Sequence, residues 1–241
     1  MKDPVITFAL PRSGSTFLTR LLNKCTNSET GDKVKYNGEL DVIELFCPLI
    51  NKVIDQDVYG IKSVTELNED KEFLSHYHFA DTDDAIHYLG NFWRMYCGGV
   101  NNWGWKNVNY GIKNDETFTH QVETLIKTYP EAKFILLDRE INDVVKSMLQ
   151  SQFWGESQKN LLLRTQNQVN NYQKILEKYP NRCFLLQYEN LINYESFIAF
   201  IKRLNWTISV ADYNLIANNK RKDDTGTKTE EIRKMLEAAS K

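Results

Sequence analysis

Residues 5–23, VITFALPRSGSTFLTRLLN, constrain the fold of this chain more than any other stretch. Val5 to Leu10 is a short apolar run rich in β-forming residues, which predicts a buried parallel strand. A small polar cluster follows, and apolar side chains then recur at helical spacing, at Leu18, Leu21, Leu22 and Cys25. The stretch therefore predicts a strand, a tight loop and a helix.

The predicted loop matches part of the phosphate-binding P-loop pattern, GxxxxGK[ST]. Residues 9–16 keep the second glycine and the final hydroxyl of this pattern, at Gly14 and Thr16. Ala9 replaces the first glycine, and Ser15 replaces the lysine. Glycine can adopt a positive φ and lets the backbone approach an anion closely. The amides of residues 13–16 would then face a ligand at a helix N-terminus, where negative charge is favoured.

The missing lysine argues against hydrolysis of a nucleoside triphosphate, because that lysine bridges the β- and γ-phosphates beside Mg²⁺. No acidic residue is clearly placed to hold such a metal, so we expect a metal-independent site. Arg12 offers a planar fork suited to an oxyanion. Hydroxyl donors are added by Ser13, Ser15 and Thr16.

The bulk composition of the 241 residues is that of an ordinary globular α/β protein. A net charge of −2 provides no global basic field, so neither nucleic acid nor a membrane surface is an expected partner. No stretch approaches the length of a membrane span, and no signal peptide precedes the first strand. The widely spaced cysteines predict buried thiols in a reducing compartment, and we expect a cytoplasmic protein.

Further apolar runs alternate with helical patterns along the chain. We expect buried strands over 133–138 and 183–188, helices over 141–150 and 159–179, and helices within 69–100. Strands that alternate with helices favour a mostly parallel sheet covered on both faces. The predicted fold is therefore a three-layer α/β/α domain.

The segment PRSGSTFLTRLLN resembles the 5′-phosphosulfate-binding loop of sulfotransferases that use 3′-phosphoadenosine 5′-phosphosulfate (PAPS). It is closest in type to the arginine-containing loops of tyrosylprotein, carbohydrate and bacterial sulfotransferases. The resemblance implies the P-loop-like sulfotransferase fold. It also implies that the cofactor is bound by Arg12, Ser13, Gly14, Ser15, Thr16 and Phe17.

Two later segments resemble other parts of the cofactor site in this family. AKFILLDREINDVVKSMLQS resembles the 3′-phosphate-binding segment, with Arg139 at a strand end and Ser147 eight residues later. The family usually has RNP or RDP after this strand, and the sequence here departs from that pattern. CFLLQYENL resembles a strand that ends in YExL, which assigns Tyr188 to the cofactor site.

The resemblance also implies candidates for catalysis. YNGELDVIE resembles a segment in which a glutamate serves as general base, which here is Glu39. Asp41, Glu44 and a histidine remain alternatives for this role. WGWKNVNYG resembles a segment whose lysine steadies the transferring group, which implies that Lys106 acts with Arg12. Lys62 remains an alternative to Lys106.

A basic cluster near the C-terminus, Lys220, Arg221 and Lys222, could complete the 3′-phosphate site or form a solvated surface. We expect one sulfotransferase domain over 1–241, with residues about 65–105 as a helical insertion on the substrate side. The implied reaction moves a sulfuryl group from PAPS to a hydroxyl or amine of a small-molecule, carbohydrate or peptide acceptor, and releases adenosine 3′,5′-bisphosphate. The alternatives are a P-loop small-molecule kinase that uses Mg-ATP and an inactive nucleotide-binding module. The oligomeric state is not predicted.

Overall fold

The computed structural model describes residues 3–39, 82–97, 101–107, 115–150 and 157–223. Asp41, Glu44 and Lys62, which the sequence offered as alternative catalytic residues, lie outside these ranges. So does about half of the expected insertion over 65–105, and its helical character is described only for one helix that ends at Tyr96.

The centre of the fold is a five-stranded sheet in which every neighbouring pair is parallel. Its spatial order is β3 (Lys35–Glu39), β4 (Trp103–Asn107), β1 (Val5–Ala9), β5 (Lys133–Asp138) and β6 (Cys183–Gln187). A second, antiparallel pair is formed by β2 (Thr26–Asn27) and β7 (Trp206–Thr207). Strand β1 therefore lies in the middle of the main sheet, between β4 and β5.

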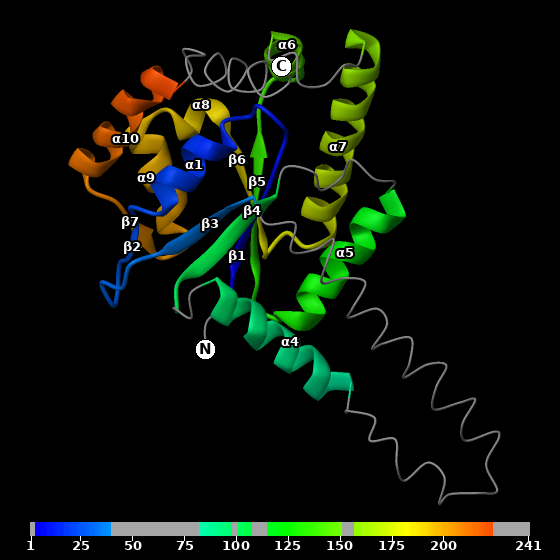
Figure 1. Cartoon of the computed structure of the whole chain (residues 1–241), viewed down its shortest axis with the longest axis vertical. Helices are drawn as coiled ribbons and strands as arrows, with labels where there is room; N and C mark the ends of the chain where they lie inside the picture. Colours follow the sequence, from blue (N-terminus) through cyan, green and yellow to red (C-terminus); the bar gives the residue numbers. More distant parts are fainter. Residues whose placement is uncertain (1–2, 40–81, 98–100, 108–114, 151–156, 224–241) are drawn as a thin grey trace, which may run out of the picture.

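Helices cover both faces of this sheet (Figure 1). One core cluster joins the sheet to α4 (Thr82–Tyr96), α5 (Asp115–Thr128), α6 (Ile141–Gln150) and α7 (Gln158–Lys178). The other joins it to α1 (Ser15–Leu22), α8 (Tyr188–Leu191), α9 (Tyr194–Lys202) and α10 (Val210–Asp223). The predicted three-layer α/β/α architecture is confirmed.

Burial on both faces explains why the central strands are continuous apolar runs. In β1, Ile6 and Phe8 pack into the α4–α7 layer, whereas Val5 and Ala9 pack into the α1 layer. Side chains of β5 alternate in the same way, because successive residues of a strand point to opposite faces. The predicted strands 133–138 and 183–188 and the helices 141–150 and 159–179 are found within one residue of their predicted ends.

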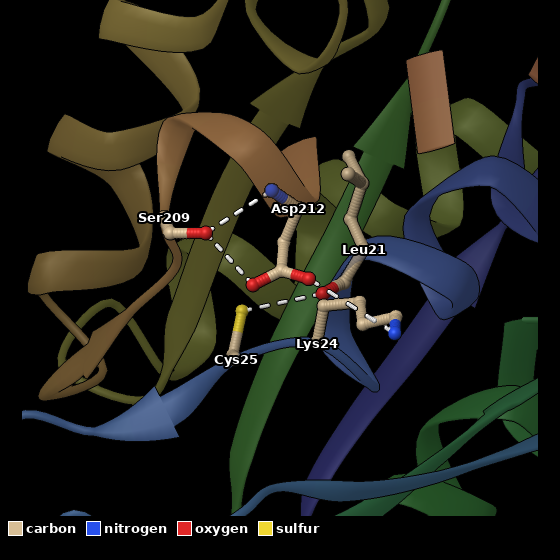
Figure 2. A network of polar contacts seen from close by, with 5 residues as sticks. All are labelled: Leu21, Lys24, Cys25, Ser209 and Asp212. Carbon is tan, nitrogen blue, oxygen red and sulfur yellow. Dashed lines mark hydrogen bonds and ion pairs between the residues drawn. The ribbon is translucent and has the colours of Figure 1, made fainter. Parts of the chain in front are cut away.

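A polar network joins the end of α1 to the start of α10 (Figure 2). Lys24 Nζ lies 4.0 Å from Asp212 Oδ1, while the Ser209 hydroxyl accepts from the Asp212 amide at 3.0 Å and donates to Asp212 Oδ2 at 2.7 Å. Ser209 thus caps α10 at the position before its first residue. From this anchor α10 runs toward the end of the molecule where the β1–α1 loop lies (Figure 1).

The described cysteines Cys25, Cys97 and Cys183 are free and buried, as the sequence predicted. Burial raises the pKa of each of these thiols. Among the residues that the structure describes, no helix is both long and apolar enough to cross a membrane.

Candidate active site

The candidate site begins in the loop between β1 and α1. Gly14 is the N-cap of α1 and has φ 92°, and Arg12 also has a positive φ of 62°. The hydroxyl and the amide of Ser13 both donate to the Leu10 carbonyl, at 2.6 and 3.2 Å. Ser13 is fully buried, so in this conformation it shapes the loop rather than lining it.

The first turn of α1 creates a positive electrostatic potential at the β1–α1 loop. A helix N-terminus leaves backbone amides without intrahelical partners, and the macrodipole adds about half a positive charge there. Gly14 has no side chain to cap these amides, and no acidic residue occupies the first turn. Ser15 is buried and Thr16 is exposed, while Phe17 packs in the core against Tyr213. The loop therefore combines features that favour an anion over a cation at this helix end.

Lys106 reaches this same helix end from the neighbouring strand. Its side chain is 4% exposed, and Nζ donates to Thr16 Oγ1 at 3.1 Å and lies 3.4 Å from Ser15 Oγ. Ser15 occupies the sequence position of the P-loop lysine. The loop has no lysine of its own, and Lys106 of β4 places an ammonium group beside it instead. This is possible because β4 pairs with β1, with Lys106 opposite Thr7.

On the other side of the loop, two segments distant in sequence come into contact. Arg12 Nε donates to Ser147 Oγ at 3.2 Å, and Arg139 Nη1 donates to the Arg12 carbonyl at 3.0 Å. Arg139 follows β5 and Ser147 lies on α6, so β5 and α6 bring both against the loop. The predicted pair and the predicted cradle therefore lie at one edge of the sheet.

Tyr188 completes this part of the site from the end of β6. A Cβ atom on Gly14 would lie 2.7 and 2.8 Å from Cε2 and Cδ2 of Tyr188, so the ring fills the space that the glycine leaves. The guanidinium carbon of Arg139 lies 4.3 Å from the centroid of the same ring. The ring therefore contacts both the loop and the arginine.

Glu39, the expected general base, lies at the end of β3. Its backbone is the register partner of Lys106, and the register shifts between Asn37 and Glu39. The extra residue at Gly38 brings Glu39 rather than Gly38 opposite Lys106. The description of Glu39 stops at its backbone, so its role stays a prediction.

A pocket of about 350 Å³ opens beside Arg139, between the ends of β5 and β6 and helix α7. It is lined by Asp138, Arg139, Glu140, Ile141, Val169, Gln187 and Glu189. Burial raises the pKa of Asp138, the nearby Glu189 and Glu140 raise it further, and a backbone hydrogen bond from Arg139 lowers it. Sequence reasoning missed these carboxylates. The sequence held a signal for them, because Asp138 ends one predicted strand and Glu189 follows the next. In the structure those strands, β5 and β6, pair in register up to Asp138 and Gln187.

The basic cluster near the C-terminus falls at the end of α10. Lys220 and Arg221 belong to the helix, but the description there is limited to the backbone. The end of α10 lies on the same side of the molecule as the loop (Figure 1). Among the described residues, no three His, Cys, Asp or Glu side chains gather as metal ligands would.

Comparison with known proteins assigns this chain to a family. A family model described as the sulfotransferase family matches residues 4–196, well over half of the chain. The chain belongs to the sulfotransferase family. The match spans the loop, Lys106, Arg139 and Tyr188, so the site described above lies inside the family region. No curated protein matches this sulfotransferase by sequence.

Solved structures similar to this sulfotransferase include three bacterial ones. A sulfotransferase domain from the olefin synthase of Synechococcus PCC 7002 is 16% identical with a TM-score of 0.54, over 88% of this chain and 77% of that one. A sulfotransferase domain from the curacin biosynthetic pathway is 16% identical, with a TM-score of 0.46 over 88% and 77%. A sulfotransferase from Alicyclobacillus acidocaldarius is 12% identical, with a TM-score of 0.46 over 87% and 83%. At these identities the first likeness supports the fold alone.

Proposed function

We propose that this sulfotransferase uses PAPS as its donor and transfers the sulfuryl group to a hydroxyl or amine of an acceptor without a metal. The observation that carries the proposal is the buried Lys106 ammonium at the N-terminus of α1, 3.1 Å from Thr16 Oγ1. A lysine ammonium beside the amides of a helix N-terminus brings two sources of positive charge to one place, which favours the binding of an anion there.

The described residues fit a carrier with two anionic ends. The first-turn amides, Thr16 and Lys106 would hold the 5′-phosphosulfate, because a glycine N-cap keeps the approach to the backbone open. Arg12 would reach the same group or the 3′-phosphate, since its Nε already lies 3.2 Å from Ser147 Oγ. Arg139 and Ser147 would bind the 3′-phosphate, and the end of α10 with Lys220 and Arg221 would add positive charge.

The chemistry divides among the residues of this chain. When bound, PAPS supplies an activated sulfuryl group and leaves as adenosine 3′,5′-bisphosphate. Lys106 and Arg12 would neutralise the charge that grows on the bridging oxygen, which is the type of stabilisation that usually dominates such transfers. Glu39 would accept the proton of the acceptor as general base, from the register position opposite Lys106. The acceptor would approach from the β3–β4 side of the loop.

Ligand-dependent melting tests the donor. We expect adenosine 3′,5′-bisphosphate at about 100 times its dissociation constant to stabilise the chain by about 2.7 kcal/mol without magnesium. ATP with Mg²⁺ should give a much smaller shift. The reverse order would replace PAPS by a nucleoside triphosphate and favour a kinase. Binding of the bisphosphate with no transfer to any acceptor offered would favour a nucleotide-binding module.

Substitutions test the division of roles. Lys106→Met should lower kcat with labelled PAPS roughly 10²–10³-fold, because it removes a charge aimed at the transition state. Arg139→Ala should instead raise KM for PAPS by about tenfold or more, because a charge-assisted contact to the donor is lost. Equal effects of the two substitutions on kcat and KM would contradict this division. Lys127→Met, on the exposed last turn of α5, is the matched lysine control and should leave both constants unchanged.

A further inference from the structure

Tyr188 connects the two anion-binding parts of the site, although it lies behind both. It begins the four-residue helix α8, directly after β6. One side of its ring packs where a side chain on Gly14 would be, with Cδ2 2.8 Å and Cε2 2.7 Å from the position of a Cβ atom. The ring also lies 4.3 Å from the guanidinium carbon of Arg139. The same side chain therefore contacts the loop glycine and the expected 3′-phosphate arginine.

Arg139 also contacts the loop directly. Its Nη1 donates to the Arg12 carbonyl at 3.0 Å, two residues before Gly14. The chain of contacts runs from Gly14 to Tyr188, from Tyr188 to Arg139, and from Arg139 back to Arg12. Arg12 holds a positive φ of 62°, which a non-glycine residue adopts at some cost. The contact from Arg139 helps to maintain that loop conformation.

The side chain of Arg139 is long and has more than one group nearby to which it could turn. Arg139 also lines a pocket whose other walls include the carboxylates of Asp138, Glu140 and Glu189. These acidic groups attract a guanidinium, and an arginine that turned toward them would leave the loop. An aromatic face stabilises a guanidinium that lies over it, and stacking removes rotamer freedom before any ligand binds. The ring of Tyr188 therefore favours the orientation in which Arg139 faces the loop.

We propose that Tyr188 is a positioning residue: its ring holds Arg139 against the β1–α1 loop and so couples recognition of the 3′-phosphate to the shape of the 5′-phosphosulfate cradle. The proposal deepens the function given above and rests on it for the identity of the ligand. The ring is needed for this role and the hydroxyl group is not.

A double-mutant cycle between Tyr188 and Arg139 tests the coupling. The variants are Tyr188→Leu, Arg139→Ala, both together, and Tyr188→Phe, and the probe is adenosine 3′,5′-bisphosphate in a direct binding titration. We expect Tyr188→Leu to weaken binding about tenfold in the wild-type background and less than twofold in the Arg139→Ala background. Tyr188→Phe should retain affinity within about twofold, since the stack and the packing on Gly14 remain. Tyr179→Leu, which removes a tyrosine ring 5.6 Å from Lys178 Nζ, is the matched control and should bind normally.

Three outcomes would overturn the proposal. These are additive effects of the two substitutions, equal losses in Tyr188→Phe and Tyr188→Leu, and an undiminished affinity in Tyr188→Leu. Melting temperatures of the wild type, Tyr188→Leu, Arg139→Ala and the double variant, measured without ligand, provide a second cycle. Here too we expect the two substitutions together to lower the melting temperature by less than the sum of their single effects. If wild-type protein did not bind the bisphosphate, the donor proposal would fail, but this second cycle would still decide whether Tyr188 holds Arg139.

Discussion

Asp138 and Arg139 are neighbours in sequence, yet their charges would have opposite effects on an anion bound beside them. Asp138 is half-buried at the end of β5, where burial raises the pKa of its carboxyl and Glu189 and Glu140 raise it further. A hydrogen bond from the backbone of Arg139 lowers it but does not reverse the shift. Ionised Asp138 therefore costs the folded chain stability and weakens the attraction of Arg139 for a phosphate.

Asp138→Asn should make the protein more stable at neutral pH. A carboxyl whose pKa is raised by folding contributes its full stability below its ordinary pKa of 3.8 and loses it as pH rises through the folded value. At pH 7 the asparagine variant avoids this loss, so we expect its melting temperature to be higher by about 1–3 °C. The difference should shrink toward zero as the pH is lowered to about 4. Melting curves recorded between pH 4 and pH 7.5 measure it.

The same variant should bind adenosine 3′,5′-bisphosphate more tightly, by roughly twofold to fivefold, because one negative charge beside Arg139 is removed. Glu131→Gln is a suitable control, since Glu131 is exposed at the other end of β5. It should change neither the melting curve nor the affinity. A stability difference for Asp138→Asn that grew toward low pH would show that the sign of the pKa shift is wrong.

At the scale of single elements, the β1–α1 loop depends on Gly14 for two separate reasons. Its φ of 92° is accessible to glycine and costly for other residues. Its missing Cβ also leaves room for the ring of Tyr188, which would otherwise lie 2.7 Å away. A substitution there meets both the conformational cost and the steric one.

Gly14→Ala should lower the free energy of unfolding by about 2–4 kcal/mol, since the strain of a positive φ adds to overpacking against the ring. Affinity for adenosine 3′,5′-bisphosphate should fall more than tenfold. Gly31→Ala separates the two causes, because Gly31 has φ 73° but nothing within 4 Å of an added Cβ. We expect Gly31→Ala to cost about 1 kcal/mol in urea denaturation and to bind normally. Equal losses in the two variants would mean that packing against Tyr188 contributes nothing.

The sequence predicted best those strands whose side chains are buried on both faces of the sheet. Strands β1, β5 and β6 are short apolar runs because helices cover both of their faces. Strand β3, with the sequence KYNGE, was not predicted, because it carries one buried aromatic among polar residues and depends on pairing with β4. Helix α5 was also missed, and its buried face becomes evident only when it packs on the sheet.

For the candidate site, resemblance to the family predicted the loop, Lys106, Arg139, Ser147 and Tyr188. Their contacts could not be predicted, because those depend on which strands are neighbours. Lys106 reaches Thr16 across 90 positions of sequence only because β4 pairs with β1. The contact of Tyr188 with both Gly14 and Arg139 likewise has no local signal.

At the scale of the whole molecule, strand order assembles the site. The strands are parallel, so the carboxyl ends of β4, β1 and β5 lie at one edge of the sheet. These three strands provide Lys106, the loop and Arg139 in that spatial order. In the function proposed above, the acceptor would approach from the β3–β4 side and the 3′-phosphate would lie on the β5 side. Displacement of β4 would therefore remove the buried ammonium without any change to the loop.

Gly104 tests this dependence, because it lies where β4 meets β1. A Cβ atom on Gly104 would lie 1.9 Å from the Val5 carbonyl oxygen and 2.6 Å from Cε2 of Tyr36. The carbonyl belongs to the backbone of the central strand and cannot turn aside, so Gly104→Ala should lower the free energy of unfolding by about 3 kcal/mol or more. Urea denaturation measures this loss. Gly38→Ala, on the neighbouring strand and with nothing within 4 Å of an added Cβ, should change stability by less than about 0.5 kcal/mol. If the two alanine variants were equally stable, β4 would not pack against β1 as closely as described. The pairing that places Lys106 beside the N-terminus of α1 would then be in doubt.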